Sequence, residues 1–250
     1  MAQTGAMISG RKRVTTPGIS IYEQSETSMH GLGDILEVGD RTFVWAKNGA
    51  GTLTPGTVAV QMTPVAEHQN VLLSADVAVG GRVLAPTFGA AASTLDQYKD
   101  GYCCINKATG FGVVYRIKTN AASAGSVACN VTLYDDLEAA VDTTTEVSLV
   151  KNKYDAVIML PTGAIPGVPL GVPLIDVTIS YYFWLQVSGP AAVLCDTGET
   201  LVIGETCGAQ DTVEVAGAVG LRDDQTTVCV GNVMYIATAA EYALVDLKLL

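Results

Sequence analysis

The sequence predicts an all-β protein, a β-sandwich or barrel-like set of strands that follows an extended N-terminal arm. Segments rich in β-branched and aromatic residues recur about every ten residues, which is the spacing typical of sandwiches and barrels. Gly, Asp and Pro separate these segments, and all three residues favour turns. The 250-residue chain has no long segment with the apolar period of an amphipathic helix.

The N-terminal part predicts an arm and a hairpin. Residues 1–30 are polar, with Gly, Ser and Thr throughout, and we expect them to form the extended arm. Residues 34–38 and 41–46 flank a Gly39-Asp40 corner. Two apolar segments joined by such a corner are typical of a β-hairpin.

The middle of the chain predicts several further strands. Residues 57–62, 102–106 and 127–133 are short, β-branched and bounded by turn residues. In residues 112–118, apolar side chains alternate with a more polar set, as in a strand with one buried face. Residues 65–79 fit either a helical turn or a short strand.

A short tandem repeat divides the C-terminal part from the rest. Residues 167–174 read Gly-Val-Pro-Leu twice, and a proline at every fourth position argues against a helix or a central strand. Strands are expected at residues 175–186, 191–194, 200–203, 226–236 and 242–249. The predicted organisation is an arm over residues 1–30, a β-rich domain over 31–160, a connector over 161–174, and a β-rich part over 175–250 that can belong to the same domain as 31–160.

The composition and charge of the chain indicate that other subunits cover part of its surface. Apolar residues make up 49% of the chain and charged residues only 16%, which suggests that an oligomer or larger assembly buries part of the surface. The net charge of −11 argues against general nucleic-acid binding. The basic cluster Arg11, Lys12 and Arg13 could dock on an acidic neighbour or be a solvated terminus.

The cysteines and the hydropathy of the chain indicate the cellular compartment in which the protein is expected. The six cysteines form no C-x-x-C pair, and no apolar run has the length of a membrane span or of a signal peptide. We therefore expect free, buried thiols in a reducing cytoplasm and no contact with a membrane.

One tripeptide suggests catalysis. Asp196-Thr197-Gly198 resembles the motif that carries the catalytic carboxylate of aspartic proteases, which need two such carboxylates sharing a proton. The chain has a single copy, so a homodimer would have to supply the second. Cys195 and Glu199 are poor flanking residues, and the alternative is a hairpin turn that uses Asp and Gly for their turn preferences.

The remaining candidates for chemistry are weaker. His30 and His68 lie in no metal-ligand pattern. Asp135-Asp136 and Asp223-Asp224 lack the spacing of a calcium loop and fit acidic turn corners. The sequence therefore predicts no enzyme, no catalytic or metal-binding residue and no cofactor.

Four adjacent aromatic residues mark a strand with two covered faces. Tyr181 and Phe183 would face one side of a strand, and Tyr182 and Trp184 the other. One face fits the core of the subunit. The other face can belong to the core as well, or it can bind a neighbouring subunit, since Tyr and Trp favour interfaces.

Several sequence blocks resemble a family of structural proteins of tailed bacteriophages. They have the forms G-D-x-x-F-x-x-A-K-x-G, Y-x-D-G-x-x-x-x-N-x-x-x-G-x-G-x-x-Y-x-I-K and Y-Y-F-W-L-Q-x-x-G-P, and they lie at Gly39–Gly49, Tyr98–Lys118 and Tyr181–Pro190, with Glu241-Tyr242 near the end. The resemblance covers about residues 38–249 and leaves out the N-terminal arm.

The resemblance implies a virion structural protein without catalytic residues. The expected role is that of a capsid decoration or cement protein, made in the host cytoplasm, that binds the outer surface of the major capsid protein lattice as a homo-oligomer, a trimer at three-fold positions. Arg11–Arg13 and Tyr181–Trp184 are the expected partner-binding residues. The alternative is a tail, fibre-base or receptor-binding module, whose exposed aromatics would contact a glycan or the host surface.

Overall fold

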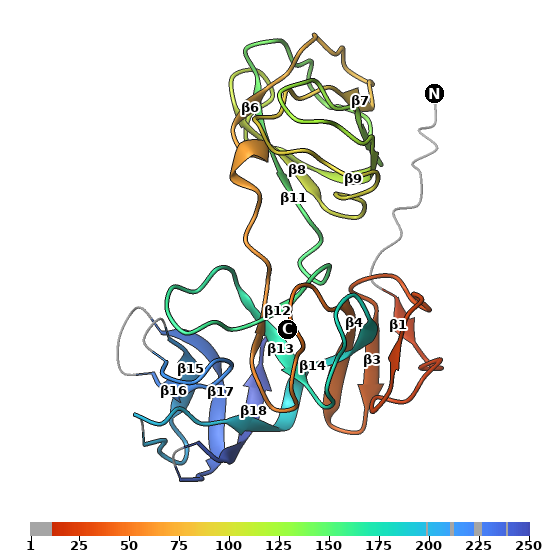
Figure 1. Ribbon diagram of the computed structural model, residues 1–250. Coiled ribbons are helices and arrows are strands. Elements are labelled where there is room, and N and C mark those ends of the chain that lie inside the picture. Colours follow the sequence, from red (N-terminus) through yellow and green to blue (C-terminus); the bar gives the residue numbers. More distant parts are fainter. Residues whose placement is uncertain (1–11, 199, 211–212, 223–226, 239) are drawn as a thin grey trace. The chain divides into compact units, whose positions relative to one another are not determined.

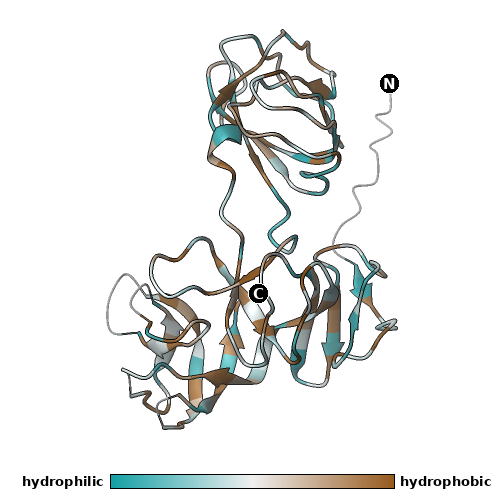
Figure 2. Ribbon diagram, in the orientation of Figure 1, coloured by the Kyte–Doolittle hydropathy of each residue, from teal (hydrophilic) through white to brown (hydrophobic). Residues whose placement is uncertain are grey.

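The chain is an all-β protein, as its sequence predicts. A computed structural model describes residues 12–198, 200–210, 213–222, 227–238 and 240–250 (Figure 1). They form strands and one short 3₁₀ helix, Ala66–His68. Hydrophobic and hydrophilic residues alternate along several strands (Figure 2). The chain divides into two compact units, unit 1 over Pro64–Asn152 and unit 2 over residues 12–63 and the described part of Lys153–Leu250.

Unit 1 is a small closed barrel. Its strands, in the order in which they pair, are β6 (Val71–Leu72), β11 (Glu146–Val150), β8 (Tyr102–Lys107), β9 (Val114–Asn120), β10 (Val131–Leu133) and β7 (Val83–Leu84). An antiparallel bridge between Leu73 and Pro86 joins the two outer strands. The N–H of Ser74 donates to the carbonyl of Ala85 at 2.9 Å, on the same seam. The sheet therefore closes on itself, and the pairing leaves no open edge between β6 and β7.

The barrel of unit 1 has its own core. Strand β9 buries Tyr115 and Ile117 and exposes Val114 and Lys118, which confirms the alternation predicted for residues 112–118. All members of this hydrophobic cluster come from unit 1. The unit thus buries its apolar side chains without help from the rest of the chain, as a domain must.

Unit 2 is built on one long, curled sheet. Its strands, in pairing order, are β1 (Arg13–Val14), β3 (Ile35–Val38), β4 (Arg41–Lys47), β14 (Tyr182–Leu194), β18 (Tyr242–Lys248), β17 (Val228–Tyr235), β15 (Thr206–Ala209) and β16 (Gly220–Leu221). Four further strands pair beside this path, β2 (Gln24–Ser25), β5 (Ala59–Val60), β12 (Ile158–Met159) and β13 (Pro169–Pro173). The predicted hairpin of residues 34–38 and 41–46 is confirmed as β3 and β4, which meet at Gly39 and Asp40.

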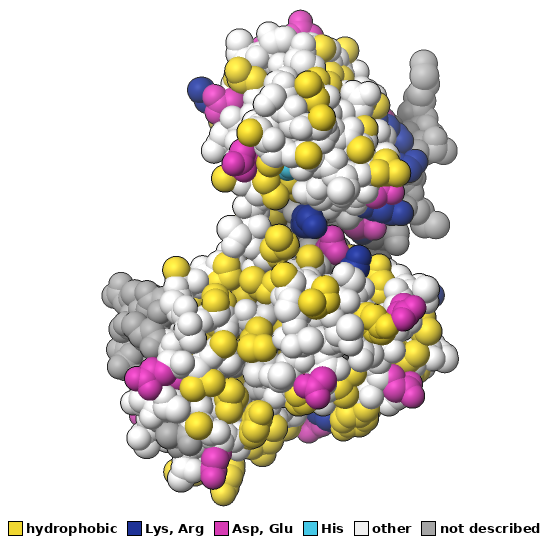
Figure 3. Space-filling view, in the orientation of Figure 1, with side chains coloured by type: hydrophobic (Ala, Val, Ile, Leu, Met, Phe, Trp, Pro, Cys, Tyr) yellow, Lys and Arg dark blue, Asp and Glu magenta, His cyan; other side chains and the backbone are white. Residues whose placement is uncertain are grey.

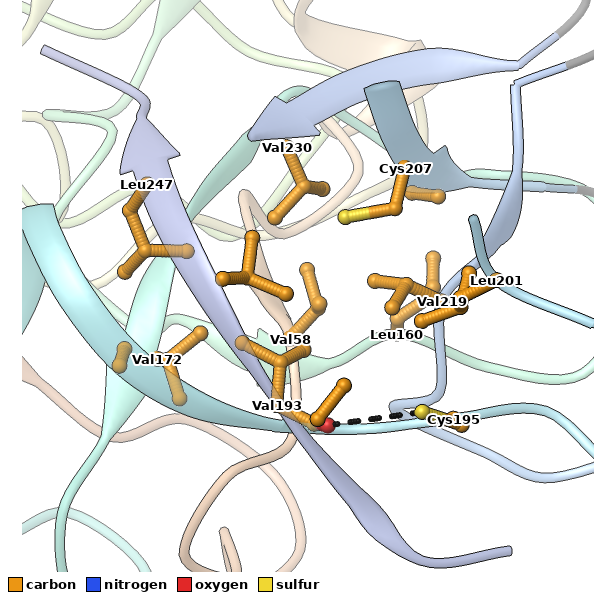
Figure 4. Close-up of a cluster of buried hydrophobic side chains, with 14 of the residues drawn as sticks. Val58, Leu160, Val172, Val193, Cys195, Leu201, Cys207, Val219, Val230 and Leu247 are labelled. Carbon is orange, nitrogen blue, oxygen red and sulfur yellow. Dashed lines mark hydrogen bonds between the residues drawn. The ribbon is translucent and has the colours of Figure 1, made fainter. Parts of the chain in front are cut away.

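The second half of β14 belongs to another closed barrel. Strands β14, β18, β17, β15 and β16 pair in sequence around the sheet. A parallel bridge between Cys195 and Val219 then returns the chain after β14 to the residue before β16. The labelled side chains in Figure 4, among them Val193, Cys207 and Val230, fill the interior.

The observed units differ from the predicted domain boundaries. Unit 1 interrupts unit 2 between β5 and β12, which are paired neighbours through Val60 and Ile158. The predicted domain 31–160 therefore joins parts of two units, and residues 153–160 belong with the C-terminal part. Sequence periodicity is the same in both units, so it carries no signal for an insertion whose two ends emerge from adjacent strands.

Most of the Gly-Val-Pro-Leu repeat, Pro169–Pro173, forms a buried strand rather than a connector. Strand β13 is buried throughout and pairs with both β14 and β5. Its two prolines, Pro169 and Pro173, occupy its first and last positions, where a missing N–H is tolerated best. The prediction that this segment cannot be a central strand is therefore wrong.

Two other expectations can be compared with the structure. Residues 65–79 contain both possibilities that the sequence left open, the 3₁₀ helix and β6. Residues 200–203 form no strand, because Leu201 enters the core while Gly204 turns the chain at a φ of 86°. The strand begins at Thr206 instead.

Residues 12–30 fold onto their own unit. Strand β1 pairs with β3, and β2 pairs with β14. Ile19 and Ile21 pack on a cluster that contains Trp45 and Trp184. The indole N–H of Trp184 donates to the carbonyl of Pro17 at 3.2 Å. The predicted extended arm is thus wrong for these residues, because their few apolar side chains find a partner in the same chain.

Candidate functional site

The Asp-Thr-Gly tripeptide has a structural role. Asp196 is 2% exposed and lies just after the bridge that closes the barrel of unit 2. Its Oδ1 atom accepts hydrogen bonds from the N–H groups of Glu214 at 2.9 Å and Val215 at 3.0 Å. Thr197 donates through Oγ1 to the Glu214 carboxylate. The carboxylate is therefore engaged in holding a turn before β16, which is the arrangement that the turn interpretation requires.

Both histidines are part of local packing. His68 is fully buried, and its Nδ1 lies 2.5 Å from the hydroxyl of Tyr98 while Nε2 lies 3.0 Å from the carbonyl of Ala91. A carbonyl can only accept, so Nε2 donates to Ala91, and in the neutral ring Nδ1 then accepts from the hydroxyl of Tyr98. His30 contacts the carbonyl of Pro17 at 2.9 Å in the same way. These hydrogen bonds of the two rings go to oxygen atoms, not to a thiol.

The six cysteines are free, as expected. Cys103, Cys129, Cys195 and Cys207 are buried, and Cys104 and Cys229 are half-buried. Burial raises the pKa of the Cys103 and Cys207 thiols to about 12. A thiol with so high a pKa forms almost no thiolate at neutral pH and is a poor nucleophile.

The acidic pairs behave as surface residues where the structure describes them. Asp136 forms an ion pair with Arg82, which lowers the pKa of the Asp136 carboxyl. Asp223 and Asp224 lie outside the described residues. Among the described residues, no group of three or more His, Cys, Asp and Glu side chains could hold a metal ion.

The predicted partner-binding aromatics belong mostly to the core. Phe183 and Trp184 are 0% and 1% exposed and lie in two different clusters of unit 2. Tyr182 stacks on Trp45 with ring centroids 6.2 Å apart, and the hydroxyl of Tyr181 donates to Glu26. The prediction that Phe183 and Trp184 bind a neighbour is wrong, because this strand is covered on both sides by its own chain.

The basic cluster lies at the start of the described chain. Arg11 is outside the described residues. The backbone N–H of Lys12 donates to Asp34, and Arg13 pairs with Glu37 at 3.0 Å between exposed side chains. Partner binding by these residues stays a prediction, and an exposed pair of this kind contributes little to stability.

The structure brings together an apolar surface that the sequence does not single out. We call it the outer strip, and it lies on the solvent side of the barrel of unit 2. It consists of Ala192 and Leu194 on β14, Tyr242 and Leu244 on β18, and Met234 and Tyr235 on β17.

Strand pairing assembles the outer strip. Ala192 is opposite Leu244, Leu194 is opposite Tyr242, and Tyr235 is opposite Leu244 on the other side. Leu244 is 37% exposed although the residues next to it, Ala243 and Val245, are buried. Figure 3 shows hydrophobic side chains gathered over the surface of unit 2, with charged side chains scattered between them.

A pocket of about 560 Å³ opens at one end of the outer strip. Tyr235 and Tyr242 belong to both the strip and the pocket. The other described lining residues are Thr197, Gly198, Thr200, Ile236, Ala237, Thr238 and Glu241. Glu241 is the charged residue among the described lining residues, so the pocket presents rings, hydroxyl groups and one carboxylate.

No protein-family model, curated protein or solved structure matches this chain. The described residues also contain no helix that is long and apolar enough to span a membrane.

The outer strip and the pocket were missed from sequence, although one signal was present. Residues 242–248 alternate as a strand, with Tyr242, Leu244, Asp246 and Lys248 on one side. An apolar pair followed by two charged residues on the same side indicates that this side faces solvent. The long-range pairing with β14 and β17 was needed to show that neighbouring strands add further apolar residues there.

Proposed function

We propose that this chain is a structural protein of a tailed-bacteriophage virion, a decoration or cement protein that binds the outer surface of the major capsid protein lattice. It would be made in the host cytoplasm and would assemble there or on the shell as a homotrimer. The sequence blocks that resemble this group of proteins support the proposal. Neither a cofactor nor a catalytic residue is part of it.

The observation that carries the proposal is the outer strip. Apolar side chains on three adjacent strands form a continuous surface that loses contact with water only when another protein covers it. Full burial of one Leu side chain contributes about 1.5–3 kcal/mol. Repeated over many copies on a shell, contacts of this size add avidity and stabilise the assembled lattice relative to free subunits.

The closed barrels support the same proposal. An open, flat sheet edge can pair with further copies of a chain and cause uncontrolled aggregation. Unit 1 closes at Leu73 and Pro86, and the barrel of unit 2 closes at Cys195 and Val219. Association at these two barrels would therefore occur through side chains on their surfaces and not through strand pairing at their seams.

The test measures binding to shells that lack this protein. Purified chain is mixed with such shells, and co-sedimentation measures the bound fraction while heating measures the temperature at which shells open. We expect the wild-type chain to bind and to raise that temperature. The variants Leu244→Asp and Ala192→Asp should each bind shells at least about tenfold more weakly, because each places a charge in an interface from which water is excluded.

The matched control is Val79→Asp in unit 1, where Val79 is 64% exposed and lies outside the outer strip. It should bind as the wild type does. Circular dichroism checks that all three variants are folded. Failure of the wild-type chain to bind shells, or binding that Leu244→Asp and Ala192→Asp leave unchanged, would contradict the proposal.

A tail, fibre-base or receptor-binding module is the second candidate. The observation that favours it is the pair of exposed tyrosines, Tyr235 and Tyr242, at the pocket. Immunogold labelling of intact particles separates the two candidates. Label over the shell supports the decoration protein, and label confined to the tail supports the second candidate.

A further inference from the structure

Tyr242 is held in place along one edge of its ring. A Cβ atom built on Gly56 would lie 2.5 Å from Cε1 and 2.7 Å from Cδ1 of Tyr242, so the ring packs directly against the backbone of Gly56. Gly56 has a φ of +75°, a conformation that L side chains rarely adopt. The tyrosine side chain nevertheless stays 50% exposed. A ring that is fixed by backbone and still open to solvent is preorganised for contact with a ligand.

Tyr235 provides a second ring from the neighbouring strand. It is 62% exposed and is paired with Leu244, the residue two positions after Tyr242 on β18. The faces of aromatic rings carry partial negative charge. The C–H groups of a sugar ring carry partial positive charge, and sugar rings therefore pack on exposed tyrosines.

The remaining wall of the pocket is polar. Thr197, Thr200 and Thr238 each bring a hydroxyl group, and Glu241 brings a carboxylate. A tight turn holds Thr238 and Glu241 together, since the N–H of Glu241 donates to the carbonyl of Thr238 at 3.0 Å and the N–H of Thr238 donates to Glu241 Oε2 at 3.3 Å. Thr197 donates its proton to Glu214, so its oxygen is oriented to accept. Sugar hydroxyl groups can pair with donors and acceptors of both kinds.

We propose that this pocket binds a neutral saccharide, with Tyr235 and Tyr242 packing on sugar rings and the threonine and glutamate side chains binding hydroxyl groups. Its volume of about 560 Å³ lies within the range of about 300–1,000 Å³ for ligand pockets. The described lining has a carboxylate and no Lys or Arg, which disfavours an acidic sugar. The proposal does not depend on the place of this chain in a virion, because the ligand is bound by the free protein.

The experiment uses the purified full chain and four probes. Lactose, cellobiose and N,N′-diacetylchitobiose are the neutral probes, and 3′-sialyllactose is the acidic one. Titration followed by NMR detects binding, with each probe raised to about 20 mM, well above a Kd of about 1 mM. We expect at least one neutral probe to bind and to shift the signals of Tyr235 and Tyr242, and 3′-sialyllactose to bind more weakly than lactose.

Single-residue variants separate the contribution of the Tyr242 ring from those of its hydroxyl group and of Thr238. Tyr242→Ala and Thr238→Val should each weaken binding by about tenfold, whereas Tyr242→Phe keeps the ring and should bind as the wild type does. Ala192→Asp, which also tests shell binding and is paired with neither tyrosine, should leave saccharide binding unchanged, so the two proposals can fail separately. Absence of binding by all three neutral probes would overturn the proposal, as would tighter binding of 3′-sialyllactose than of every neutral probe.

Discussion

The buried carboxylate of Asp196 accepts a hydrogen bond at 3.0 Å from the backbone N–H of Val215, nineteen residues further along the chain. The N–H of Asp196 itself donates to the carbonyl of Val219 at 3.0 Å, at the bridge that closes the barrel of unit 2. One residue thus ties the end of β14 to the turn before β16 through its backbone and its side chain. This connection explains why an aspartate stands at a position that looks catalytic in the sequence.

We expect Asp196→Ala to destabilise unit 2 by about 2 kcal/mol, because the backbone N–H groups of Glu214 and Val215 lose their acceptor. Asp196→Asn keeps an oxygen at the same position and should lose about half as much, since a neutral acceptor is weaker than a charged one. Thermal unfolding measures both. The control is Asp40→Ala at the exposed β3–β4 turn, which should change stability by less than about 0.5 kcal/mol. Equal effects of Asp196→Ala and Asp40→Ala would contradict this role.

Gly189 is required by close backbone packing in β14. It has a φ of +82°, and a Cβ atom there would lie 2.3 Å from the carbonyl oxygen of Asp40. Gly189→Ala should therefore cost more than about 2 kcal/mol, from backbone strain together with a clash. Gly39 is the matched control, because it has a φ of +63° and nothing within 4 Å of its added Cβ. Gly39→Ala should cost only about 1 kcal/mol, and denaturant unfolding of the two variants measures the difference.

Unit 1 should lose stability in alkali. Burial raises the pKa of Tyr98 from 10.0 to about 12 and that of Cys103 from 9.0 to about 12. Both groups stay protonated in the folded unit and release a proton more readily when unfolded. Their contribution is present in full below the unfolded pKa values and is lost as the pH rises through the window from about 9 to about 12.

Thermal melting between about pH 8 and about pH 10.5 tests this dependence. Cys103→Ala removes one ionisable group and should flatten the decline in melting temperature. Tyr98→Phe should flatten it as well, and it should also lower stability at neutral pH because His68 loses the hydroxyl group that donates to it. A pH dependence that both variants leave unchanged would show that other groups are responsible.

The two units should fold separately. Unit 1 has its own hydrophobic cluster, and β5 and β12 remain paired neighbours on either side of the insertion. We expect residues 64–152 alone to fold, and we expect unit 2 to fold when a short Gly-Ser linker replaces them. Cooperative melting and dispersed NMR spectra measure both outcomes. A unit 2 chain that melts without cooperativity would show that it depends on unit 1.

The local pattern of the sequence determined the all-β class, the β3–β4 hairpin, the alternation along β9 and the free thiols. Each of these depends on residues that are close in the chain, such as Tyr115 and Ile117, or on composition. The alternation of side chains along a strand is visible within a few consecutive residues, so a strand can be predicted without knowing its partners.

Only the tertiary structure decided the rest. Whether Trp184 is core or interface depends on Pro17 and Trp45, which lie far away in sequence. The insertion of unit 1, the strand formed by the proline repeat, and the outer strip with its pocket all arise from pairing between distant segments. The stability of such a pairing depends on the side chains of the neighbouring strand. The two-residue alternation of one strand does not depend on which strand pairs with it, so it cannot identify the partner.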